Sequence, residues 1–145
     1  MQRSTLFAAA LLVAAAASPP PAGAQADEHR LPTASYAVSR IDRETQMLAA
    51  MRNQISEGEI SMIAVSGLGP SERRMLTARR RSALRAAMDK ATVASNDRAN
   101  GESEDQNSLS EYVQRHHVDP SNVFAVAIQN QPDPQNPHVT LFYRR

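Results

Sequence analysis

Arg80 is the residue of this 145-residue chain whose setting most favours ligand chemistry. On a helical wheel it shares a mainly apolar stripe, whose other members are Leu76, Ala83, Leu84, Ala87 and Ala91. A guanidinium on such a stripe needs a carboxylate or several acceptors, because an unpaired buried charge is costly. Near a helix start it could bind a ligand carboxylate through two parallel hydrogen bonds. The alternative is an ion pair with an acid of the chain itself, or a side chain that reaches the rim of the core.

The predicted helix that carries Arg80 is rich in cations. Its seven basic residues outnumber its two acids by five charges; they are Arg73, Arg74, Arg79, Arg80, Arg81, Arg85 and Lys90. We expect Arg74, Arg81 and Arg85 to share an outer face that could meet an acidic glycan, an anionic lipid or an acidic partner. The favoured alternative is a solvated face, partly neutralised by the acidic loop predicted at 96–107. Nucleic acid is not an expected partner, because no aromatic residues are interleaved with the cations.

The remaining side chains with catalytic potential form no motif. The chain has no Cys, which excludes disulfides, thiolate nucleophiles and Cys-ligated zinc. It has no G-x-S-x-G, S-x-x-K or P-loop sequence, and no motif places a base beside Ser66. His116 and His117 are adjacent, so on a helix they diverge and cannot both face one ion well, even if Asp119 or His138 joined one of them. We therefore expect no enzyme activity, no metal site and no cofactor.

The start of the chain predicts a secretory signal peptide at 1–24. Arg3 precedes an unbroken apolar run at 6–17, which is too short to span about 30 Å of hydrocarbon. Prolines and small residues follow, as is typical of a cleavage site before Gln25 or Asp27. Removal of this segment leaves 15 basic and 15 acidic residues. We expect a periplasmic protein with no transmembrane segment in its mature chain.

Strands and helices alternate in the predicted mature chain. We expect a flexible leader at 25–34 and a single domain at 35–145. The predicted strands lie at 35–38, 60–65, 123–128 and 139–143, and the predicted helices run from Ser39 to Gly58, over 71–94 and over 109–117. This order, β-α-β-α-(α)-β-β, predicts an α+β fold. We expect one mixed sheet of about four strands, with the helices packed mainly on one face.

Together with three local matches, this order resembles the OmpA-like C-terminal domain, which binds peptidoglycan in the periplasm. The strand at 60–65 runs into Gly67, as the family's second strand runs into its glycine. The segment L-T-A-R-R-R-S-A-L at 76–84 is similar to the family's L-S-x-x-R-A-x-x-V helix start. The segment V-D-P-S-N-V at 118–123 and the last strand are similar to the family's turn and its N-R-R-V-E-I strand. The resemblance covers 35–143.

The resemblance implies that Gly67 and Arg80 lie at the ligand site. In the family, an Asp of a G-H-T-D loop and the helix Arg hold the diaminopimelate group. Here the loop at 67–70 reads G-L-G-P, so the Asp is missing, and Pro137-His138 stands where the family has two Arg.

The chain is therefore expected to be a non-enzymatic binding module of the bacterial cell envelope, with weak peptidoglycan contact. The alternative is an accessory subunit that keeps the fold, has lost peptidoglycan binding and binds an envelope protein. The sequence leaves the oligomeric state open.

Overall fold

The computed structural model describes residues 31–52, 54–94, 107–130 and 133–145. The predicted signal peptide, most of the leader and nearly all of the acidic loop lie outside these residues. Pro32–Arg145 form one compact unit. Within the described segments, no helix combines the length and the apolar character that crossing a bilayer requires.

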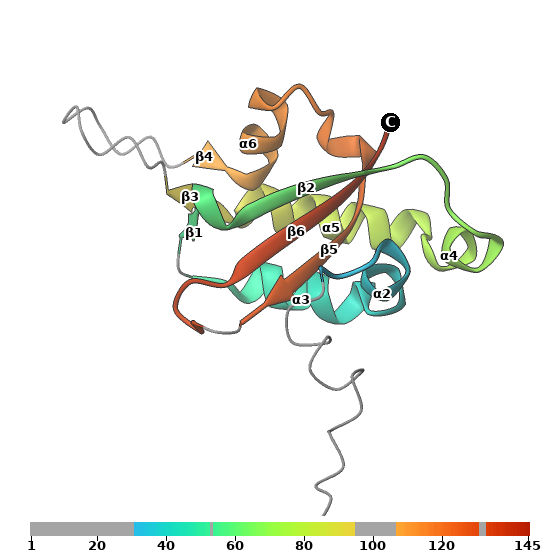
Figure 1. Cartoon of the computed structure of the whole chain (residues 1–145), viewed down its shortest axis with the longest axis horizontal. Helices are drawn as coiled ribbons and strands as arrows, with labels where there is room; N and C mark the ends of the chain where they lie inside the picture. Colours follow the sequence, from blue (N-terminus) through green and yellow to red (C-terminus); the bar gives the residue numbers. More distant parts are fainter. Residues whose placement is uncertain (1–30, 53, 95–106, 131–132) are drawn as a thin grey trace, which may run out of the picture. The chain divides into compact units, whose positions relative to one another are not determined.

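The main sheet contains three of the four predicted strands, in the order β2 (Ile60–Val65), β6 (His138–Arg144) and β5 (Val123–Gln129) (Figure 1). β6 runs parallel to β2 and antiparallel to β5, which confirms that these segments share one sheet. The central strand β6 is buried from Val139 to Phe142, whereas every residue of β2 is only half-buried. The sequence suggested cover on both faces of β2. Both faces are in fact covered, since Ile60 and Met62 pack against one group of core side chains and Ile63 and Val65 against the other. The cover is incomplete because β2 is an edge strand.

A second, smaller sheet contains β1 (Ile55–Ser56), β3 (Thr92–Ala94) and β4 (Asn107–Ser108) in the order β1-β3-β4. β1 and β3 are parallel, and β3 and β4 are antiparallel. The sequence predicts helix at β1 and β3, because strands of two or three residues are too short to display a period. The α+β class is thus confirmed, but with two three-stranded sheets in place of one sheet of about four strands.

The segment predicted as the first strand is a helix, α2 (Ala34–Ser39). Thr33 caps it, because its Oγ1 accepts a hydrogen bond of 3.2 Å from the backbone N–H of Tyr36. A second helix, α3 (Ile41–Ala50), follows directly and ends well before Gly58, which lies in the 3-10 turn η1 (Glu57–Glu59). The helix expected from Ser39 to Gly58 is therefore α3, which ends earlier than expected. A separate helix, α2, precedes it.

The free edge of β5 is covered by α3. The carboxylate of Glu44 is buried and accepts a hydrogen bond of 2.9 Å from the backbone N–H of Ile128. A helix that covers an edge strand, here with a carboxylate that binds one of the free N–H groups of the strand, blocks the addition of another strand.

The predicted second helix is two helices, α4 (Pro70–Met75) and α5 (Ala78–Lys90). Pro70 is the first residue of α4, where its missing N–H would have no helical partner. Thr77 lies between the two helices and caps α5. Its Oγ1 accepts a hydrogen bond of 3.3 Å from the backbone N–H of Arg80. A Thr that caps a helix cannot also lie inside one, and this explains why a continuous helix over 71–94 is wrong.

The third predicted helix is confirmed as α6 (Leu109–Arg115). Its capping box is complete: the Ser108 hydroxyl accepts from the Glu111 N–H at 3.2 Å, and the Glu111 carboxylate accepts from the Ser108 N–H at 2.8 Å. The turn after α6 is also confirmed as η3 (Pro120–Asn122), which Asp119 caps by accepting from the Ser121 N–H at 2.8 Å.

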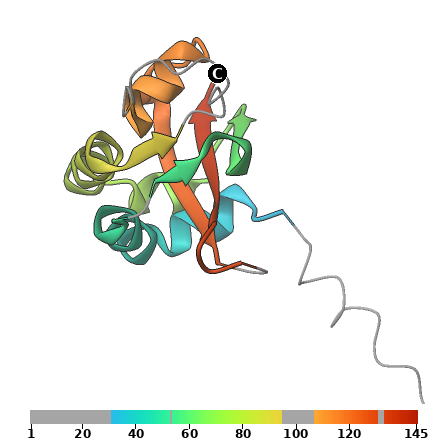
Figure 2. The ribbon, with the colours of Figure 1, turned by 90° about the vertical axis from the view of Figure 1, so that its left-hand side faces the viewer.

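Two groups of buried side chains form the core. In Figure 2, α3, α5 and α6 lie together on one side of the main sheet. The larger group joins these helices to the sheet and includes Leu48, Leu84, Ala87, Met88, Val113, Val126 and Leu141. The smaller group joins α2 to the same sheet and includes Ala37, Val38, Ile41, Leu76, Phe124 and Phe142. Leu84 and Ala87 therefore pack as predicted, whereas Leu76 belongs to the smaller group and Ala83 is exposed.

Candidate functional site

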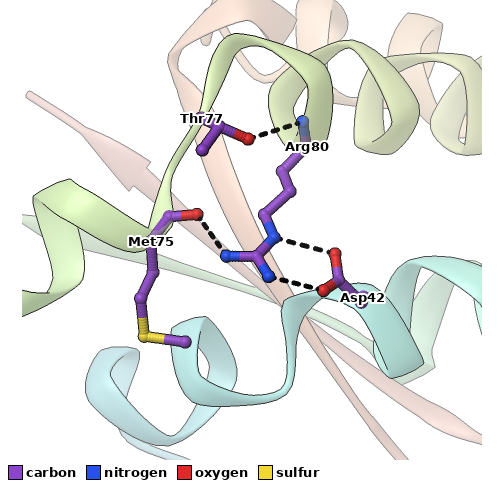
Figure 3. A network of polar contacts seen from close by, with 4 residues as sticks. All are labelled: Asp42, Met75, Thr77 and Arg80. Carbon is purple, nitrogen blue, oxygen red and sulfur yellow. Dashed lines mark hydrogen bonds and ion pairs between the residues drawn. The ribbon is translucent and has the colours of Figure 1, made fainter.

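The Arg80 guanidinium is held by partners from within the chain (Figure 3). Nε donates to Asp42 Oδ1 at 2.9 Å, and Nη2 donates to Asp42 Oδ2 at 2.7 Å. Nη1 donates to the backbone carbonyl of Met75 at 2.9 Å. All three guanidinium nitrogens therefore donate within the protein, and the pairing with the carboxylate is bidentate.

This network links three helices. Arg80 lies in the first turn of α5, Asp42 in the first turn of α3, and Met75 ends α4. The Arg80 side chain is 32% exposed and that of Asp42 60% exposed, so the pair lies at the rim of the core. The sequence left open an intrachain ion pair or a ligand contact, and the structure contains the ion pair. A ligand carboxylate would have to displace Asp42 before it could bind the same two guanidinium nitrogens of Arg80.

Gly67 lines a shallow pocket of about 300 Å³ to which Arg80 does not contribute. Its lining residues are Val65, Ser66, Gly67, Leu68, Arg73, Arg144 and Arg145. β2 and β6 are parallel neighbours, and Val65 is paired with Arg144. The carboxyl ends of the two strands therefore meet at this pocket. α4 supplies Arg73. A Cβ added at Gly67 would have no atom within 4 Å, so the pocket beside it is open.

The Gly67 pocket is electropositive. Its lining includes the exposed side chains of Arg73, Arg144 and Arg145, and no acidic side chain. None of these three arginines forms an ion pair with a residue that the structure describes. Uncommitted guanidinium groups around a hollow suit a carboxylate or phosphate ligand.

Glu72 is the acid that precedes Arg73 in the sequence, and its carboxylate lies beside the pocket, against Gly69, without lining it. Its carboxylate accepts a hydrogen bond of 2.7 Å from the Ser35 hydroxyl of α2. That bond is the main reason why the pKa of Glu72 is lowered, and the positive charge of Arg73 lowers the same pKa further. Glu72 is thus a carboxylate held by Ser35.

The basic residues predicted to share an outer face are divided between two helices. Arg74 is exposed on α4, whereas Arg81 is exposed on α5. Arg85 lies 3.7 Å from Asp89, one turn further along α5. The expectation of a single helical face is wrong because the helix is interrupted at Thr77.

The histidines and their predicted companions have separate surroundings. The His116 ring packs against that of Tyr112 at a tilt of 49°, with ring centroids 4.4 Å apart, and burial raises the pKa of the Tyr112 hydroxyl. His117 has a φ of 59° after the end of α6, and the pKa of Asp119 is lowered by its hydrogen bond to Ser121. His138 contacts Ser61 and Glu59. Among the described residues, no three His, Asp or Glu side chains are grouped so as to hold a metal ion.

The sequence did not predict the arginine triplet of the Gly67 pocket. Its pattern places Arg73 on the basic helix and indicates no role for Arg144 and Arg145. The usable signal is two arginines at the end of the last strand, combined with parallel pairing of that strand to the one before Gly67. Strand pairing cannot be derived from spacing, so the triplet becomes visible only in the fold.

Comparisons with known proteins yield no identification of this chain. No protein-family model matches it. No curated protein and no solved structure matches it either. The function of the chain must therefore be inferred from the pocket and the side chains described above.

Proposed function

We propose that the protein is a secreted, periplasmic binding module of the bacterial cell envelope, with an OmpA-like fold, that makes weak contact with peptidoglycan. The observation that carries the proposal is the arginine triplet, Arg73, Arg144 and Arg145, around the pocket at Gly67. The peptide carboxylates of peptidoglycan carry the charge and the planar geometry that a guanidinium recognises.

The ligand contact is assigned to the triplet and Gly67, and not to Arg80. Arg80 already donates to both carboxylate oxygens of Asp42, so a ligand gains nothing there unless it breaks that pair. The three pocket arginines carry no such partner among the described residues. Because their side chains are exposed, salt screens their attraction for an anion, and the binding is weak at physiological ionic strength.

Sedimentation with purified peptidoglycan tests this proposal. The mature chain should sediment with the sacculi at low salt and be released as salt is raised. The double variant Arg144→Gln/Arg145→Gln should lose most of this binding. A matched control is Arg43→Gln/Arg79→Gln, which removes the same charge from two exposed positions outside the pocket. Equal sedimentation of both double variants would mean that net charge, and not the pocket, governs binding.

A second candidate function is supported by the free edge of β2. Ile60–Val65 contains no charged residue and no Pro, and among the described strands it pairs with β6 alone. At the other edge of the sheet, Glu44 accepts a hydrogen bond from the β5 backbone and blocks strand addition. Among the described residues, no side chain binds the free edge of β2 in this way. An extended segment of an envelope protein could add to β2 as a further strand, which would make the chain an accessory subunit.

Photo-crosslinking in cells separates the two candidates. A photoreactive residue in place of Ala64 on β2 should form a discrete protein adduct if the chain is an accessory subunit. The same residue in place of the exposed Ser82 on α5 should form none. Absence of a protein adduct at Ala64, with sedimentation as described above, would favour the peptidoglycan contact.

A further inference from the structure

Three side chains distant from the Gly67 pocket form a chain of polar contacts. The Ser61 Oγ lies 2.9 Å from His138 Nε2. On the other side of the imidazole, His138 Nδ1 lies 3.2 Å from Glu59 Oε2. The contacts are partly buried, with the His138 side chain 27% exposed and that of Glu59 42% exposed. The three side chains are therefore partly shielded from solvent and still accessible to small molecules.

The sheet register explains why these residues meet. Ser61 is paired with Thr140 across β2 and β6, so both side chains lie on one face of the main sheet. His138, two positions before Thr140, lies on that same face at the start of β6. Glu59, two positions before Ser61, ends η1 immediately ahead of β2. Two paired strands thus position Ser61 and His138, and the 3-10 turn that leads into β2 positions Glu59.

The order of contacts matches that of an activated nucleophile. A neutral imidazole that donates from Nδ1 to the Glu59 carboxylate leaves Nε2 as the acceptor for the Ser61 hydroxyl. A hydroxyl beside a base, with that base oriented by a carboxylate, is the arrangement that covalent catalysis uses. Neither Ser61 nor His138 lies in a motif, and 77 positions separate them in the sequence.

We propose that Ser61 is a nucleophile that accepts an acyl group from a carboxylic ester, with His138 as its base and Glu59 as the residue that positions His138. Ser61 Oγ forms a bond to the ester carbonyl carbon while its proton passes to His138 Nε2. The carbon–oxygen bond to the alcohol then breaks, and the alcohol leaves with that proton. Water, deprotonated by the same imidazole, hydrolyses the acyl-serine to a carboxylic acid and regenerates the Ser61 hydroxyl.

Donors for the developing negative charge on the carbonyl oxygen are available at β2. Because β2 pairs with β6 alone among the strands that the structure describes, alternate backbone N–H groups of β2 point away from β6 and have no partner in a described strand. A substrate that lies along this edge can place its carbonyl oxygen against them. The proposal goes beyond the anion-binding function and uses none of the residues that line the Gly67 pocket. It also departs from the expectation, drawn from motifs alone, that the chain is not an enzyme.

The test uses p-nitrophenyl acetate with the complete mature chain. Release of nitrophenolate is followed by absorbance, and intact-mass and peptide mass spectrometry locate the acetyl group. The wild type should acquire one acetyl group on Ser61, and Ser61→Ala should acquire none. His138→Gln should slow acetylation by roughly 10²–10⁴-fold, the usual contribution of a positioned base. Ser82→Ala, an exposed serine of α5, should behave as the wild type.

Glu59 requires a readout that a purely structural role would not change. Glu59→Gln should slow acetylation, and Glu59→Asp should restore part of the rate because it restores the carboxylate. Circular dichroism and thermal unfolding of every variant establish that the fold is intact. The proposal is overturned if folded wild type carries no acetyl group on Ser61 and also releases nitrophenolate no faster than Ser61→Ala. It is equally overturned if folded His138→Gln reacts as fast as the wild type, since the three residues would then only fasten β2 to β6.

Discussion

The molecule contains two arginine sites that are used in opposite ways. Arg80 donates to Asp42 and to the Met75 carbonyl, and it joins three helices. Arg73, Arg144 and Arg145 surround a pocket and form no ion pair with any described residue. The same side chain therefore fastens helices at one site and stays available to an anion at the other.

The difference follows from where each backbone segment lies. Arg80 is in the first turn of a helix that packs on the core, so neighbouring helices bring acceptors within reach. Arg144 is the exposed last residue of β6, and Arg145 follows it. An arginine near a core is stabilised by internal partners, whereas one at a strand end is solvated until a ligand arrives. The following variants separate the two sites, from the largest expected effect to the smallest.

Leu84→Asp should disrupt the Arg80 site by removing the support beneath it. Leu84 is 1% exposed in the larger core group, and an unpaired charge there should lower the free energy of unfolding by about 4 kcal/mol. Urea unfolding followed by circular dichroism measures the loss. Ala83→Asp places the same charge at the preceding, exposed position and should change stability by less than about 1 kcal/mol. Similar unfolding midpoints for the two variants would mean that this face of α5 is not the core face.

Removal of the Arg80–Asp42 pair should have a moderate effect. Because both side chains are substantially exposed, solvent screening limits the pair to about 1 kcal/mol despite its bidentate geometry. A double-mutant cycle of Arg80→Ala and Asp42→Asn, followed by chemical unfolding, should give a coupling of that size. Arg79→Ala, an exposed neighbour, should show no coupling to Asp42→Asn. A coupling of zero for Arg80 would leave its guanidinium free for a ligand and remove the contrast between the two sites.

The pocket arginines should have almost no effect on stability. Arg144→Gln/Arg145→Gln should leave the free energy of unfolding within about 0.5 kcal/mol of the wild type, because exposed side chains without ion pairs contribute little. Thermal and chemical unfolding check this expectation. If the free energy of unfolding fell by about 2 kcal/mol or more, these arginines would also stabilise the fold.

The smallest effect concerns the pKa of Glu72, beside the pocket. Ser35→Ala removes the hydrogen bond that contributes most to its lowered pKa, so the pKa should rise toward its ordinary value. A lowered folded-state pKa contributes stability that is present above the unfolded pKa and is lost as pH falls through the folded pKa. Ser35→Ala should therefore reduce the acid dependence of stability slightly. Carboxyl-carbon NMR titration measures the shift, with Asp119, whose pKa is lowered by Ser121, as an unchanged reference.

Several parts of the fold could be predicted from local sequence. The three strands of the main sheet, the capping box at Ser108 and Glu111, and the turn at Asp119 all lie where residue patterns indicate them. Each depends on residues within a few positions of one another. The apolar face at Leu84 and Ala87 was predictable for the same reason, since it depends on the helical period alone.

Other parts depend on contacts between distant segments. The short stretch at 35–38 carries adjacent apolar residues, a pattern that fits a strand or a helix, and packing against the sheet settles it as α2. The sequence marks Arg80 as needing an acceptor, but only the fold of α3 against α5 makes Asp42 that acceptor.

The sequence by itself determined the α+β class, the three strands of the main sheet and the N-terminal cap of α6, because these follow from local periodicity and short-range hydrogen bonding. The tertiary structure alone decided which guanidinium groups are engaged and which remain open. It also brought Ser61 to His138 through the parallel pairing of β2 with β6. Strand pairing is a long-range choice made by the whole core, so no spacing along the chain encodes it.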